Sequence, residues 1–175
     1  MNTSLLKSFD LLETQRAEIL AMISPLSTEQ LNAHPKGKWS IAQVLSHLIS
    51  SERLSVNYMN KKILGIQEAP DSGLADACKT ILLIVSQRLP LKFKAPKVLV
   101  EKTVQYQSAL QLIEAWEKTR HELKEVLARL NDDQLKRKIY RHPLAGMLNI
   151  QQALRFFREH IIHHTPQIKN LLKQK

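Results

Sequence analysis

"LSTEQLNAHPKGKWSIAQVL", residues 26–45, is echoed later in the chain by "LNDDQLKRKIYRHPLAGMLNIQQAL", residues 130–154. Each stretch opens with a polar segment that predicts a short helical turn, continues through a His-Pro pair, and ends in a new helix. A long segment with apolar residues at helical spacing precedes each stretch. This helix, turn, loop and helix, used twice, predicts an all-α four-helix bundle, built as a pseudo-repeat of two helix pairs.

The helix starts carry a further signal in the polar residues that precede them. Ser40 is followed by Gln43, and Asn149 by Gln152, which is the spacing of a capping box. The four long helices are predicted at about residues 4–24, 40–64, 108–130 and from 149 onward. Trp39 and Leu148, just before the two caps, are expected to pack at the bundle ends as staple-like residues.

The middle of the chain is less regular. Residues 76–89 predict another helix, which Pro90 closes. Residues 90–107 contain two prolines among alternating apolar and basic residues, a pattern that favours an extended connection.

Size and composition favour one domain, residues 1–175. Apolar residues make up 43% of the chain, and only 4 glycines are present, which disfavours a turn-rich β fold. The single Cys78 excludes an internal disulfide and a cysteine-based zinc cluster. Lys7 and Asp10 interrupt the first apolar pattern, so it does not resemble a signal peptide. Without a run of about eighteen apolar residues for a membrane helix, we expect a cytoplasmic protein.

The formal net charge of +10 raises the possibility of nucleic-acid binding. The basic residues are spread over several segments, and no aromatic residues interleave with them as a stacking platform for single strands requires. A solvated basic surface is therefore favoured, and a nucleic-acid face is the least favoured of the functional hypotheses.

Three histidines near the C-terminus, in "HIIHHTPQI" (160–168), carry the functional signal. His160 and His164 are four residues apart and fall on or beside the apolar stripe of their predicted helix. His163 is turned about 100° from His164 and is expected on the flank. The stripe comprises Ile150, Ala153, Phe157, Ile161, Ile168 and Leu171.

A third imidazole interrupts the buried face of the helix that starts at Ser40. His47 lies between Val44 and Ser51 on that face, and facing helices of a bundle are roughly 8–10 Å apart. A lone buried histidine is usually satisfied by hydrogen bonds. Three neutral histidines with an open position, in contrast, are the ligand set of a catalytic zinc site. The remaining histidines, His34, His142 and His121, are expected in loops or facing solvent.

The ordered set of motifs resembles the DinB/YfiT-like family of bacterial four-helix-bundle proteins. The motifs are Trp39-Ser40-x-x-Gln43-Val44-Leu45-x-His47-Leu48, His142-Pro143-Leu144-x-Gly146-x-Leu148 and His160-x-x-x-His164-x-x-Gln167-Ile168, with 31–35 and 92–96 in the family's order. The resemblance implies that His47, His160 and His164 bind a divalent ion, Zn²⁺ or Ni²⁺. It also implies a homodimer. Characterised relatives are transferases and an isomerase that use low-molecular-weight thiols such as bacillithiol or mycothiol, and many others are described only as metal-dependent hydrolases.

The functional hypotheses therefore come from different classes. The first is a metal-dependent enzyme acting on a small molecule, either by hydrolysis or by transfer of a low-molecular-weight thiol. Glu52 and Glu159 are expected to point away from the histidines, so the catalytic residues stay unassigned. Gln167 is the candidate for orienting a ligand ring or a bound water. The alternative is a non-catalytic metal-binding or stress-response protein.

Overall fold

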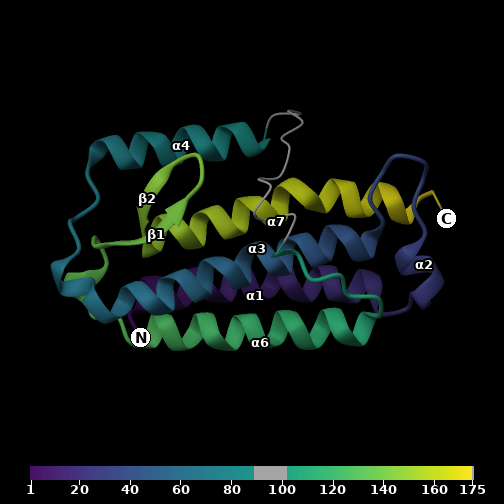
Figure 1. Cartoon of the computed structure of the whole chain (residues 1–175), viewed down its shortest axis with the longest axis horizontal. Coiled ribbons are helices and arrows are strands. Elements are labelled where there is room, and N and C mark those ends of the chain that lie inside the picture. Colours follow the sequence, from purple (N-terminus) through teal and green to yellow (C-terminus); the bar gives the residue numbers. More distant parts are fainter. Residues whose placement is uncertain (89–101, 175) are drawn as a thin grey trace.

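Four long helices form the body of the molecule in this computed structural model, which describes residues 1–88 and 102–174. They run along the long axis of the molecule (Figure 1). Their bounds are Thr3–Ile23 (α1), Ile41–Lys62 (α3), Ala109–Ala128 (α6) and Ile150–Leu172 (α7). Shorter elements connect them: Thr28–Asn32 (α2), Ile63–Glu68 (η1), Leu74–Arg88 (α4) and Asp132–Gln134 (η2). The predicted four-helix bundle is confirmed.

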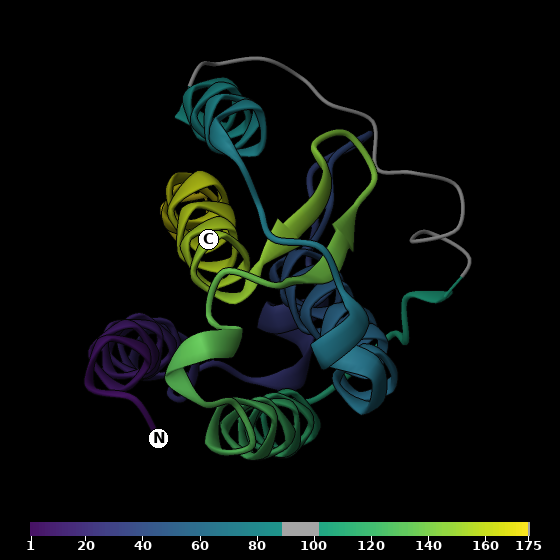
Figure 2. The same ribbon diagram turned by 90° about the vertical axis from the view of Figure 1, so that its left-hand side faces the viewer.

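The two halves of the pseudo-repeat interlock. Viewed from the end in Figure 2, α1 and α3 occupy diagonal corners of the bundle, and α6 and α7 occupy the other two. Accordingly α3 packs against α6 and α7, and α1 packs against the same two helices. Each half therefore buries its apolar stripes against the other half.

The core lies between these helices and uses the predicted stripes. All six residues of the predicted α7 stripe are buried, and Trp116 of α6 is fully buried. Pro166 lies inside α7, where it removes the amide that would bond the carbonyl of Ile162.

Side-chain caps fix where the long helices begin. The Oγ of Ser40 accepts a hydrogen bond from the Gln43 amide, and Oε1 of Gln43 accepts one from the Ser40 amide. The same reciprocal pair joins Asn149 and Gln152. Both predicted capping boxes are therefore present, and Ser27, Ser108 and Asn131 head three more.

A β-hairpin was missed by the sequence prediction, which treated the stretch around His142-Pro143 as a loop. Strands Lys138–His142 (β1) and Gly146–Asn149 (β2) pair antiparallel. Gly146 has φ 76°, a conformation that glycine adopts without steric cost. The hairpin packs on α3 and α7, beside α4 (Figure 1).

Helix α4 lies outside the bundle, against α7 and β2. It corresponds to the predicted helix at residues 76–89, but it begins at Leu74. Much of the predicted connection at 90–107 lies outside the described residues, as do the 92–96 family segment and Pro90. In the described part of the chain, no helix has the length and apolar character needed to cross a membrane.

Candidate metal centre

His47 is placed by helix α3, whose start is fixed by the Ser40–Gln43 capping box. The helix buries an apolar face that includes Val44 and Leu48, and His47 lies within this buried region with only 7% of its surface exposed. The imidazole therefore points into the bundle, toward α7, as the sequence predicted.

His160 and His164 lie one turn apart on α7 and face α3. The candidate nitrogen atoms of these two residues and of His47 all lie within 4.8 Å of one another. The Nε2 atoms of His47 and His160 are 3.2 Å apart. Two ligands of a tetrahedral zinc ion, each roughly 2.0–2.1 Å from the metal, would be about 3.3–3.4 Å apart. The spacing of this pair thus fits two ligands of one ion with small adjustments.

Gln167 fixes the orientation of one ring. Its Oε1 lies 2.9 Å from Nδ1 of His164, so that Nδ1 carries the proton and donates it to the amide oxygen. The Nε2 of His164 is then left with a free lone pair for a cation. Gln167 is the residue for which the sequence suggested a role in orienting a ligand ring or a bound water.

The three rings are held in their neutral, ligating form by burial. Desolvation, with a smaller contribution from His163, lowers the pKa of His47 to about 4. Desolvation likewise lowers the pKa of His164 to about 4, although its bond to Gln167 opposes the shift. The pKa of His160 falls well below its ordinary value because of desolvation and its neighbouring imidazoles. A cation therefore does not compete with the protonated imidazolium forms at neutral pH.

Aromatic side chains border the three histidines. The ring of Phe156 stacks on His160, with centroids 5.4 Å apart and an interplanar angle of 15°. The indole of Trp39 lies 5.4 Å from the His47 ring and is 39% exposed. Trp39 therefore borders the histidines. The sequence predicted Trp39 only as a staple-like residue at the bundle end and did not predict its contact with His47. Sequence spacing cannot reveal it, because Trp39 precedes the helix.

The two nearby carboxylates are occupied elsewhere. Glu52 lies 2.8 Å from Nε of Arg120 and accepts a hydrogen bond from the Trp116 indole. Glu159 accepts two hydrogen bonds of 2.8 Å from Arg88. Within the described residues, the cluster of candidate ligands contains histidines alone.

The remaining histidines lie outside the cluster. His163 stacks edge-on against His164, with centroids 4.9 Å apart, but is not among the converging ligands. Nδ1 of His142 accepts hydrogen bonds from two amides of the hairpin turn, Leu144 and Ala145. His34 is exposed, and His121 is exposed beside Glu125.

Comparison with known proteins gives the family. The family model described as the DinB superfamily matches residues 11–168. The chain belongs to the DinB superfamily. Its DinB fold is also that of a solved structure, YfiT from Bacillus subtilis, with a TM-score of 0.61 and 19% sequence identity. That match covers 99% of this chain and 89% of YfiT, which is described as "a probable metal-dependent hydrolase with an unusual four-helix bundle topology". No curated protein sequence matches this DinB chain.

Proposed function

We propose that this protein is a metal-dependent enzyme that acts on a small molecule, with Zn²⁺ or Ni²⁺ bound by His47, His160 and His164. The observation that carries the proposal is the convergence of three neutral imidazoles inside the bundle. Imidazole suits both metals, and a set of three protein ligands leaves a position for substrate. When bound, such an ion supplies either a water of lowered pKa or a place for a cofactor's thiol to bind as thiolate.

Two reactions remain open at such a site. Hydrolysis is supported by the description of YfiT as a probable metal-dependent hydrolase. Transfer of a low-molecular-weight thiol is supported by the engagement of Glu52 and Glu159 with arginines, because a thiolate nucleophile needs no general base.

The metal-loaded protein should be tested in parallel with a thiol plus an electrophile and with simple esters and amides. Turnover that needs the metal and is lost in His160→Ala supports the proposal and selects the reaction. Stoichiometric metal binding without either activity supports the non-catalytic metal-binding protein.

We also propose that the protein forms a homodimer through the exposed face of α4. Leu74 is 88% exposed, Leu82 71% and Ile81 52%, and Cys78 and Val85 lie on the same face. An apolar stripe of this kind on a soluble protein usually marks an interaction surface. Light scattering should show a dimer that Leu82→Glu dissociates, whereas Leu64→Glu, at an exposed leucine outside α4, should leave it intact. The free, exposed thiol of Cys78 favours a reducing compartment, and we propose the cytoplasm.

A further inference from the structure

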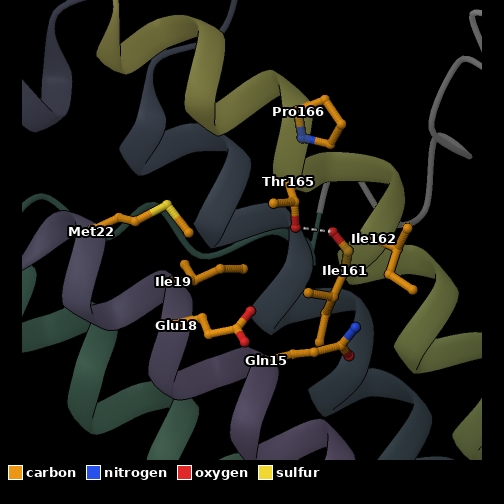
Figure 3. A pocket seen from close by; sticks show the side chains of 8 residues that line it. All are labelled: Gln15, Glu18, Ile19, Met22, Ile161, Ile162, Thr165 and Pro166. Carbon is orange, nitrogen blue, oxygen red and sulfur yellow. Dashed lines mark hydrogen bonds between the residues drawn. The ribbon is translucent and has the colours of Figure 1, made fainter.

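A cleft opens between α1 and α7 (Figure 3), and none of the three clustered histidines lines it. Its volume is ≈ 260 Å³, enough for roughly nine water-sized groups at about 30 Å³ each. Four residues of α7 line it, and none is a histidine: Ile162 and Pro166 are turned about 200° from the nearest histidine of the cluster, and Ile161 and Thr165 about 100°. The cleft is therefore a separate site on the same helix.

The walls of the cleft are apolar. Ile19 of α1 and Ile161 of α7 are buried beneath it, and Met22 and Pro166 complete the sides. A ligand with a short hydrocarbon body would bury that body here, gaining roughly 25 cal/mol for each Å² of apolar surface removed from water.

Two side chains of the cleft, Gln15 and Glu18, offer hydrogen-bond acceptors. Oε1 of Gln15 is buried and has no hydrogen-bond partner. Glu18 is exposed, and its carboxylate is in none of the ion pairs of the described segments. Figure 3 shows this carboxylate and the Gln15 amide pointing from α1 toward α7. A buried acceptor without a donor costs about 1–3 kcal/mol. A ligand that brings N–H groups would recover this loss.

Pro166 leaves a backbone carbonyl of α7 without its helical donor. Because proline has no amide hydrogen, the carbonyl of Ile162 lacks its usual donor four residues on. The Thr165 hydroxyl does not replace that donor, since it donates to the carbonyl of Ile161 at 2.8 Å (Figure 3). The side chains of Glu18 and Gln15 thus bring one carboxylate and one amide oxygen to an apolar cleft, which is also lined by Ile162, the residue whose carbonyl lacks its helical donor.

We propose that this cleft binds a primary organic ammonium group attached to a short apolar body. The ammonium carries a positive charge that matches the carboxylate of Glu18 and N–H donors that match the amide oxygen of Gln15. The site is independent of the metal, because none of the three histidines lines it. The net charge of the chain is +10, so its long-range field attracts anions, and this cleft would bind a ligand of the opposite charge.

The test is an NMR titration of the full-length, metal-loaded protein with hexylammonium chloride, compared with hexan-1-ol. We expect saturable shifts of amides in residues 15–22 of α1, with a Kd on the order of 1 mM. Helix α1 carries none of the proposed metal ligands, so shifts there distinguish the cleft from amine coordination to the metal.

Glu18→Gln keeps the shape of the side chain and removes its charge, so it should weaken hexylammonium binding at least about tenfold. Glu117→Gln, at an exposed glutamate of α6, is the matched control and should change nothing. Absence of saturable shifts in α1, equal affinity for hexan-1-ol, or equal affinities in the two variants would each overturn the proposal.

Discussion

Helix α3 contributes to two polar clusters inside the same bundle, and the two clusters differ in how they are satisfied. Toward α6, Glu52 meets Arg120 at 2.8 Å, with Trp116 donating to the same carboxylate. Toward α7, His47 meets His160 and His164. His47 and Glu52 are five residues apart, about 140° around the helix, so α3 separates the clusters.

The ion-pair cluster contains its own opposite charges. Glu52 and Glu13 face Arg120, and Arg16 pairs with Glu13 at 2.7 Å. The histidine cluster contains three groups of one kind, each neutral because of burial. A hydrogen bond between two of the imidazoles, His47 and His160, leaves other ring nitrogens of the cluster without a partner, whereas a bound cation would accept one nitrogen lone pair from each of the three rings. A buried cluster without an internal complement is thus the stronger indication of a ligand from outside.

The largest expected effect comes from breaking the ion-pair cluster. Arg120→Met leaves the buried Glu52 carboxylate without its cation and should lower the free energy of unfolding by about 3–5 kcal/mol. Urea denaturation measures the loss. Metal bound per folded chain should not change, because the histidines are untouched.

Glu52→Leu/Arg120→Met is the matched double variant and should recover most of that stability, since both charges are then gone. Lys118→Met, at an exposed residue of α6, should change little. A loss below about 1 kcal/mol in Arg120→Met would show that the ion pair is not the feature that satisfies this cluster.

The next effect concerns Gln167. Gln167→Leu removes the acceptor that fixes the His164 tautomer and should weaken metal binding about 10- to 100-fold, with little change in stability. Competition with a chromophoric chelator measures the affinity. Gln151→Leu, at an exposed glutamine of the same helix, should retain the affinity of the unmodified protein; comparable weakening in both would remove the role assigned to Gln167.

The smallest expected effect is the change that each buried histidine makes in the free energy of unfolding as the pH changes. The folded pKa of His47 is about 4, below the unfolded value of about 6.5, so the unfolded chain binds the extra proton between these values. Stability of the metal-free protein is therefore present above pH 6.5 and is lost as the pH falls toward 4. Each buried histidine should cost about 1–2 kcal/mol between pH 7 and 5.

Chemical denaturation at several pH values measures this slope. His47→Gln should reduce it, whereas His121→Gln, at an exposed histidine, should leave it unchanged. An identical slope in His47→Gln would mean that His47 is not buried in its neutral form.

The sequence predicted the bundle well because its signals are local and repeated. Capping boxes mark the starts of α3 and α7, and apolar spacing over five or six turns defines which face is buried. The same spacing was enough to point His47, His160 and His164 into the bundle. The three histidines converge because α3, which carries His47, faces α7, which carries His160 and His164.

The hairpin and the Trp39 contact could not be predicted in the same way. Strands of 5 and 4 residues give too short an alternation to outweigh the His142-Pro143 loop signal. Trp39 lies before its helix, so no periodicity relates its ring to His47. The diagonal placement of α1 and α3 depends on how the two halves pack, which local patterns do not encode.

The central claim is that the histidine cluster is satisfied by a metal ion, and it is tested most directly by metal stoichiometry in two neighbouring variants. Untagged protein, His164→Ala and His163→Ala should each be loaded with zinc, dialysed and measured by elemental analysis. The account predicts one equivalent in the unmodified protein and in His163→Ala, and none in His164→Ala, with all three folded because the bundle has its own apolar core. Equal loss of zinc in the two variants, or full retention in His164→Ala, would contradict it.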